Sequence, residues 1–233
     1  MREYHKIDSV FKRDPAANNK SFVMGDWAQE AFGYLADNTW VFTEKVDGTN
    51  IRVMVTPQSE GGAVTFGGKT DAASIPGPLV TKLNERFLTI EQRQNLSAAF
   101  PDGACLYGEG YGAKIQSGGN YRPDQDFVLF DVAVGEWWLE RPNIEDVAAK
   151  LGLDVVPIIG TGTLHAMIEQ VRKGFKSRWG DFAAEGIVAR PAVELKTRNG
   201  ARIITKVKHK DFNTHAQRKA SDVSEPVDTK PPE

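Results

Sequence analysis

The sequence lacks the features that mark several classes of protein. Cys105 is the only cysteine among 233 residues, so no disulfide can form within the chain, and no cysteine–histidine cluster has the spacing of a zinc site. No apolar run approaches the ~20 residues of a membrane-spanning helix. The first residues, MREYHKIDSVFKRD, are charged and unlike a signal peptide. We therefore expect a cytoplasmic protein with no membrane segment.

An excess of charge of one sign is also lacking. The chain has 29 Lys and Arg against 31 Asp and Glu, which gives no global electrostatic case for nucleic-acid binding. Residues 196–219, however, hold eight Lys or Arg and one acid. This basic region is a candidate nucleic-acid track, and a solvated charged surface is the simpler interpretation. Residues 214–233 offer little to bury, so we predict one domain over residues 1–213 followed by a disordered tail.

Short runs of alternating apolar residues, the pattern of β-strands, dominate the sequence. Helical spacing is rarer, and neither repeats nor a β–α–β rhythm occur. We expect an α+β fold of mostly antiparallel sheets with flanking helices. The predicted strands cover residues 40–43, 51–56, 63–66, 104–108, 127–134, 186–189 and 201–208; the predicted helices cover 78–100 in one or two segments, 144–152 with Asn143 as N-cap, and 164–175.

The segment EKVDGTN, residues 44–50, places a lysine between two acids after an apolar run. A lysine amine with a pKa of about 10.4 is a poor nucleophile near neutral pH, so it needs neighbours that lower its pKa. Glu44 and Asp47 would act in the opposite direction. Taken alone, Lys45 is either a nucleophile or part of a solvated turn.

Lys206 and Lys208 lie two residues apart in the segment ITKVK. In a strand this spacing directs both side chains to one face and Val207 to the other. Such a pair suits phosphate groups and could lower the pKa of a third lysine nearby. The alternative is an exposed face of solubilising lysines.

The glycine-rich stretch GEGYGAK, residues 108–114, does not fit a P-loop. Ala113 stands where that pattern requires Gly, and Ile115 where it requires Ser or Thr. What remains is Glu109, at the end of an apolar strand and beside glycines that allow a ligand to approach closely. Glu109 is a candidate for binding a ribose hydroxyl or a metal ion, or it is an acid in a turn.

Three further side chains stand out at apolar strands. Phe130 could stack on a base or belong to the core. Asp131 follows it, and a carboxylate in such a run must be paired, capped or functional. Glu185 precedes the strand GIVA and is a candidate ligand for a divalent metal, or the acid of a simple turn.

In their order along the chain, these segments resemble the motifs of the covalent nucleotidyltransferases, which include ATP-dependent polynucleotide ligases and mRNA capping enzymes. KVDGTN resembles the K-x-D-G motif whose lysine carries the nucleotide, and LYGEG, VLFDV, EGIVARP and ITKVK resemble the motifs that follow. Within this superfamily the sequence is most similar to phage-type RNA ligases, which have Glu before the lysine and Asn five residues after it. Glu44 and Asn50 hold these positions, and the stretch FGGKTDAASIP resembles another segment of such proteins.

The resemblance implies an adenylation domain of the ligase catalytic type, ATP-grasp-like in fold, and a role for each motif residue. Lys45 would form lysyl-AMP, Glu44 would contact the adenine edge, and Lys69 would contact a phosphate where the family often has Arg. By the same resemblance, Asp47, Asn50 and Arg52 would support the site, Glu109 would hold the ribose and Phe130 would stack on the base. Glu185 would place the metal. Lys206 and Lys208 would hold the α-phosphate and promote departure of pyrophosphate.

The implied function is that of an ATP-dependent RNA ligase that uses Mg²⁺ or Mn²⁺. It would move AMP from Lys45 to a 5′-phosphate RNA end and seal that end to a 3′-hydroxyl. The alternatives are a DNA nick ligase and a nucleotide- or RNA-binding module without chemistry; a guanylyltransferase fits less well. Such ligases usually add an OB-fold or another accessory domain after the last motif. Because 25 residues follow Lys208 here, we expect no C-terminal OB-fold. We therefore expect an accessory protein or domain that acts in trans.

Overall fold

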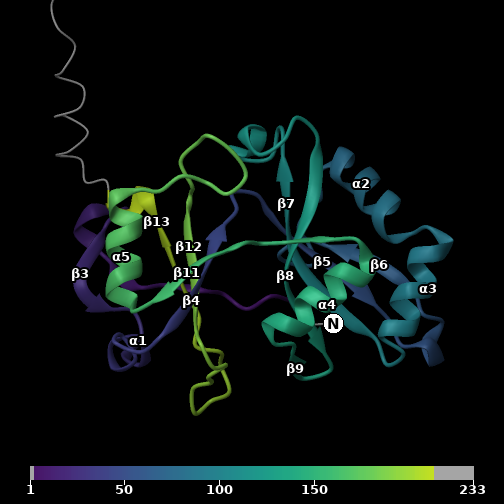
Figure 1. Cartoon of the computed structure of the whole chain (residues 1–233), viewed down its shortest axis with the longest axis horizontal. Coiled ribbons are helices and arrows are strands. Elements are labelled where there is room, and N and C mark those ends of the chain that lie inside the picture. The colour runs from purple at the N-terminus through teal and green to yellow at the C-terminus, as the bar shows by residue number, and fades with distance from the viewer. Residues whose placement is uncertain (1–2, 213–233) are drawn as a thin grey trace, which may run out of the picture.

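The structure, a computed structural model, describes residues 3–212. The predicted tail lies outside this range. Two large sheets stand side by side, each with helices on its outer side (Figure 1). No helix in the described part of the chain is both long and apolar enough to cross a membrane.

The first sheet has the strand order β1-β13-β12-β4-β11, and the second has the order β10-β8-β7-β5-β6, with β9 paired to β8. Neighbouring strands are antiparallel except in the pairs β1–β13 and β10–β8. The predicted α+β class with mostly antiparallel sheets is therefore confirmed. The strands are β1 (Asp8–Ser9), β2 (Phe11–Arg13), β3 (Phe22–Trp27), β4 (Trp40–Lys45), β5 (Thr49–Val55), β6 (Val64–Gly67), β7 (Ala104–Gly112), β8 (Gln125–Val134), β9 (Trp137–Trp138), β10 (Asp154–Val155), β11 (Ile158–Gly162), β12 (Gly186–Pro191) and β13 (Thr205–Lys208).

Each large sheet has its own hydrophobic core. The helices α2 (Gly77–Phe87), α3 (Ile90–Ala99) and α4 (Arg141–Leu151) cover the second sheet, and α1 (Glu30–Tyr34) and α5 (Leu164–Lys173) pack on the first. Helical periodicity explains the packing, since α2 buries Leu79, Leu83 and Phe87, which lie on one face. The alternation of β4 does the same for the first sheet: Trp40 and Phe42 face the core, which leaves Lys45 on the opposite face.

Several predicted boundaries are wrong. Strand β7 continues to Gly112, so Glu109 lies inside the strand and not at its end. Helix α4 begins at Arg141 with Glu140 as N-cap, so Asn143 lies inside the helix; Pro142 in the first turn suits a helix start, because proline lacks the N–H that this position leaves unpaired. The predicted strand 201–208 is regular only over Thr205–Lys208, and its first half makes a single bridge between Arg202 and Lys196.

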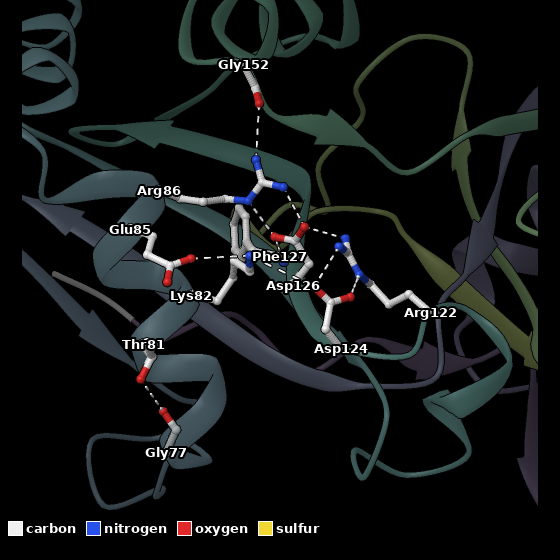
Figure 2. A network of polar contacts seen from close by, with 10 residues as sticks. All are labelled: Gly77, Thr81, Lys82, Glu85, Arg86, Arg122, Asp124, Asp126, Phe127 and Gly152. Atoms are coloured by element: carbon white, nitrogen blue, oxygen red, sulfur yellow. Dashed lines mark hydrogen bonds and ion pairs between the residues drawn. The ribbon is translucent and has the colours of Figure 1, made fainter.

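A network of ion pairs attaches α2 to β8 (Figure 2). The Asp126 carboxylate is fully buried and accepts hydrogen bonds at 2.5 Å from Nε and Nη2 of Arg86. It also accepts one from Arg122 and one from the backbone N–H of Phe127. The favourable interactions outweigh burial and hold the pKa of Asp126 below its ordinary value, with Arg86 the main cause.

Asp126→Ala should lower the free energy of unfolding by about 2–4 kcal/mol, because it leaves the partly buried Arg86 guanidinium without its counterion and leaves Arg122 with Asp124 alone. Asp146→Ala is the matched control, since it breaks the exposed pair with Lys150 on α4 and should cost no more than about 0.5 kcal/mol. Urea unfolding of both variants measures the difference. Equal losses of unfolding free energy would show that the buried network contributes no more to stability than an exposed ion pair.

Candidate active site

A pocket of about 710 Å³ lies between the two large sheets. The first sheet contributes side chains of β4, β12 and β13 to its lining, and the second contributes side chains of β5, β7 and β8. This volume lies within the range of small-molecule sites. The predicted site residues that line it are Glu44, Lys45, Asn50, Lys69, Glu109, Phe130 and Lys206.

Lys45 is the last residue of β4, and the turn that follows it is tightly held. Any side chain at Gly48 would place its Cβ 2.3 Å from the carbonyl oxygen of Gly110, so only glycine fits there. The Asp47 N–H donates to the Tyr121 hydroxyl at 3.2 Å, and the Asp47 carboxylate accepts from the Ser117 N–H at 3.2 Å. Asp47 therefore supports the turn that follows Lys45.

Glu185 lies between two of the predicted lysines. Strand β12 is flanked by β4 and β13, and its first residue pairs with both Lys45 and Lys208. Glu185 precedes that residue and accepts from Lys45 Nζ at 2.7 Å, while its other oxygen is 2.6 Å from Lys208 Nζ. Lys206 lines the same pocket and Val207 is buried, so the face assignment made from the strand period is confirmed.

The expected lowering of the Lys45 pKa is not found. Burial acts to lower it, but the carboxylates of Glu185, Glu109 and Asp47 act to raise it, and the net shift is upward. Lys208 cannot oppose this strongly, because its charge is paired with Glu185. It is Lys206 whose pKa is lowered, by burial first and then by Lys45 and Lys208.

The opposite wall of the pocket carries Asn50 and Glu109, which are cross-strand partners on β5 and β7. The Asn50 Oδ1 atom is buried and has no hydrogen-bond partner among residues 3–212, so it is available to a ligand. Burial raises the pKa of Glu109 to about 7, while Lys45 opposes the shift and Glu185 adds to it. Phe130 is half-buried on β8, and Lys69 is exposed at the edge of the pocket.

Glu109→Gln should stabilise the protein at about pH 8 but not at about pH 4. The folded protein holds the Glu109 proton up to a pH of about 7, whereas the unfolded chain releases it near 4.5. Because the folded state binds more protons across this window, the Glu109 contribution to stability falls as the pH rises through it. Urea unfolding should show a gain on the order of 1–3 kcal/mol above pH ~7. Glu60→Gln, at an exposed position, is the control, and a gain independent of pH would contradict the expectation.

Glu44 is oriented differently from Lys45. Its side chain is buried on the opposite face of β4, where its carboxylate accepts from the Ser177 hydroxyl at 2.6 Å and from the Arg178 N–H at 2.8 Å. The predicted contact of Glu44 with adenine stays a prediction. Arg52 is buried and donates to the Gly68 carbonyl and to Asp71, which fixes the segment next to Lys69.

The Asp131 carboxylate is paired, which is one of the three possibilities expected for an acid in an apolar strand. It accepts from the Tyr4 hydroxyl at 2.8 Å, from Arg190 at 2.8 Å and from Arg202 at 2.6 Å. Arg202 also pairs with Glu194 at 2.5 Å. Arg202 therefore belongs to a buried ion cluster and cannot be part of an exposed nucleic-acid track, which corrects the interpretation of the basic region as one surface.

Sequence reasoning missed several residues of the pocket, among them Thr43, Val188 and Arg190. All three follow from the strand period once a pocket-facing residue is known: Thr43 is two residues before Lys45, and Val188 pairs with Lys206. Tyr121 gave no such signal, because it lies in a loop that only the fold brings to the turn after Lys45.

Lys45 and Lys206 line one wall of a pocket between two mostly antiparallel sheets, and Glu185 joins Lys45 to Lys208 beside it; this arrangement fits a nucleotidyltransferase domain. Residues 38–208 match the RNA ligase family. That match covers well over half of the chain, and the protein belongs to this family.

The fold is similar to solved structures of an RNA ligase from Naegleria gruberi. A variant of that enzyme with ATP and Mn gives a TM-score of 0.63 at 14% identity, covering 95% of this chain and 58% of the other. The same enzyme with PPi gives a TM-score of 0.61 at 17% identity, covering 94% and 60%. This chain thus spans less than two thirds of the length of those proteins. By sequence, no curated protein matches the chain.

Proposed function

We propose that this protein is an ATP-dependent RNA ligase whose Lys45 carries AMP. The observation that carries the proposal is the position of Lys45 in the pocket, with its amine 2.7 Å from Glu185 and with Lys206 and Lys208 on β13, the strand on the other side of β12. The family supports ligation of RNA rather than the alternatives of DNA nick sealing or binding without chemistry.

In the first step, Lys45 Nζ gives up a proton, and Glu185, which accepts its hydrogen bond, is placed to receive it. The nitrogen lone pair then forms a bond to the α-phosphorus of ATP, and the bond from that phosphorus to the pyrophosphate oxygen breaks. Lys206 and Lys208 hold the negative charge that develops on the phosphate oxygens. Lys69, exposed at the edge of the pocket, contacts a phosphate.

The nucleoside would lie between the two walls. Phe130 on β8 and Val188 on β12 come from different sheets and both line the pocket, so a base can stack between them. Glu109, in its ionised form, accepts hydrogen bonds from the ribose hydroxyls, and Asn50 next to it offers its unpaired Oδ1 atom. Glu44 also lines the pocket, and its carboxylate, which Ser177 and the Arg178 N–H hold in place, would contact the adenine edge.

The residues present suit a divalent ion such as Mg²⁺ or Mn²⁺. Among residues 3–212 no group of three or more His, Cys, Asp and Glu side chains forms a metal cage, but Mg²⁺ is commonly held by one or two carboxylates together with substrate phosphates. Glu185 would hold the ion in this way. When bound, it would neutralise charge on the phosphates; the N. gruberi enzyme was solved with ATP and Mn.

In the later steps, a 5′-phosphate oxygen of RNA attacks the phosphorus of lysyl-AMP and releases Lys45, and a 3′-hydroxyl then displaces AMP. We further propose that residues 1–213 form the adenylation domain, that an accessory protein or domain in trans contributes to RNA binding, and that the protein is cytoplasmic.

The experiment is incubation of the protein with α-labelled ATP or GTP and Mg²⁺ or Mn²⁺, followed by a denaturing gel. Label from ATP and not from GTP supports the proposal, and no label with either nucleotide favours the binding module. The labelled protein is then given 5′-phosphorylated RNA or nicked DNA with 3′-hydroxyl ends. Sealing of the DNA in preference to RNA would replace RNA ligase by DNA nick ligase.

A further inference from the structure

Two loops from different sheets meet beside the turn that follows Lys45. Residues 113–121 follow β7, and residues 176–183 lie between α5 and β12. In Figure 1 they are the teal and green loops at the upper end of the molecule, between the sheets. The Tyr121 hydroxyl accepts the Asp47 N–H, so the first loop touches the turn directly.

Three half-buried aromatic side chains form the junction of these loops: Tyr121, Trp179 and Phe182. The ring centroids of Tyr121 and Trp179 are 5.6 Å apart at 76°, and those of Tyr121 and Phe182 are 4.9 Å apart at 79°. An edge-to-face contact uses the face of only one of its two rings. Tyr121 and Trp179 also pack against a buried cluster that includes Tyr111. Because the three rings are only half-buried, part of each stays at the surface, where a base can stack.

The same loops carry exposed cations. Lys114 and Arg178 are exposed, and neither forms an ion pair within residues 3–212. The single acid of the two loops, Asp181, is paired with Lys176 at 2.9 Å. The two loops that form the aromatic junction thus carry two unpaired positive charges, in a protein whose net charge is −2.

Both loops are fixed to the active site rather than free. Glu44 holds the second loop through Ser177 and the Arg178 N–H. In the first loop, Lys114 and Gln116 have positive φ values of 67° and 49° on either side of the buried Ile115. Such backbone is costly for residues other than glycine, and here it accompanies a buried anchor between two exposed side chains.

We propose that this surface, the aromatic rim (Lys114, Tyr121, Arg178, Trp179 and Phe182), binds single-stranded RNA next to the 5′-phosphate end that receives AMP. The inference rests on the proposed function. Ring faces suit unpaired bases, which a duplex would hide, and the two free cations complement the phosphates between them. The rim is also continuous with the Lys45 turn through Tyr121 and Asp47, where the RNA end must arrive.

RNA binding is measured without ATP, by fluorescence anisotropy of a 5′-phosphorylated single-stranded 12-mer. Trp179→Ala should weaken binding about tenfold or more, whereas Trp179→Phe, which keeps a stacking ring, should retain most of the affinity. Arg178→Ala should weaken binding and reduce the slope of log affinity against log salt by about 0.7. The controls are Trp137→Ala, at an aromatic 76% exposed elsewhere, and Arg93→Ala on α3.

An unchanged affinity in both Trp179→Ala and Arg178→Ala would overturn the proposal. It would also be overturned if the wild type bound an RNA duplex as tightly as the single strand and Trp179→Ala weakened both equally. If Trp179→Ala proves unstable in a thermal melt, Arg178→Ala and its salt slope decide. Sealing of RNA that already carries 5′-AMP provides a second readout and needs no lysyl-AMP. A wild type that binds RNA through the rim but is never labelled by ATP would refute the proposed ligase activity and leave the rim in place.

Discussion

Lys45→Ala should abolish the labelled protein formed with α-labelled ATP, a loss of at least about a thousandfold, because it removes the amine that we propose forms the covalent bond to AMP. Lys206 and Lys208 are amines too, but Lys208 is paired with Glu185 and both would be occupied by phosphate oxygens. The measurement is the initial rate of label incorporation on a denaturing gel.

Lys45→Arg sharpens the test. The guanidinium keeps the positive charge beside Glu185, so folding should be preserved, but it stays protonated and cannot act as a nucleophile. Lys150→Ala, at an exposed lysine of α4, should be labelled like the wild type. If Lys45→Arg is still labelled, Lys45 is not the nucleophile. Lys206 would then be the next candidate, because its pKa is lowered by burial and by its cationic neighbours.

The raised pKa of Lys45 gives this test a further use. In the protein without nucleotide, the surrounding carboxylates keep the amine protonated, so the nucleophile must be activated when ATP binds. The rate of labelling at saturating ATP should therefore rise with pH more steeply than ATP binding does. A rate that does not change with pH would show that proton loss from Lys45 does not limit the reaction.

The wall of the pocket that carries the lysines could be predicted from sequence because strand period alone decides which side chains share a face. Lys206 and Lys208 follow this rule, and so does the burial of Val207. The same rule, applied to β4, places Glu44 on the face opposite Lys45, where Ser177 occupies its carboxylate. Glu44 and Lys45 are neighbours in the sequence motif, but in the strand their side chains lie on opposite faces.

The features that could not be predicted from sequence depend on contacts between residues far apart in the chain. The strands β1, β2, β9 and β10 have only two or three residues each, and β1 joins its sheet by parallel pairing with β13, which local pattern does not encode. The sign of the Lys45 pKa shift also escaped prediction, because it depends on Glu109 and Glu185, which approach from two different sheets. The partners of Asp131 come from segments as far apart as Tyr4 and Arg202.

Asp131→Ala should lower the free energy of unfolding by about 3–5 kcal/mol, the largest stability effect we expect. The carboxylate is fully buried and is the shared counterion of Arg190 and Arg202. Its removal leaves the Arg190 guanidinium without its ion-pair partner and leaves Arg202 with Glu194 alone. For a protein of this size the thermal midpoint should fall by about 10 °C. Glu194→Ala, which removes only the partly exposed partner of Arg202, should cost clearly less.

The same variant tests what the cluster does for the active site. Asp131 lies on β8 of the second sheet, beside Phe130, and Arg190 lies on β12 of the first, so their ion pair joins the two walls of the pocket. If it fixes their separation, Asp131→Ala should raise the KM for ATP several-fold at temperatures where the variant is still folded, because a base between Phe130 and Val188 needs both walls. If the KM is unchanged while the thermal midpoint falls, the cluster contributes to stability alone. The spacing of the two walls would then depend on the aromatic contacts between Tyr121 and the loop that carries Trp179 and Phe182.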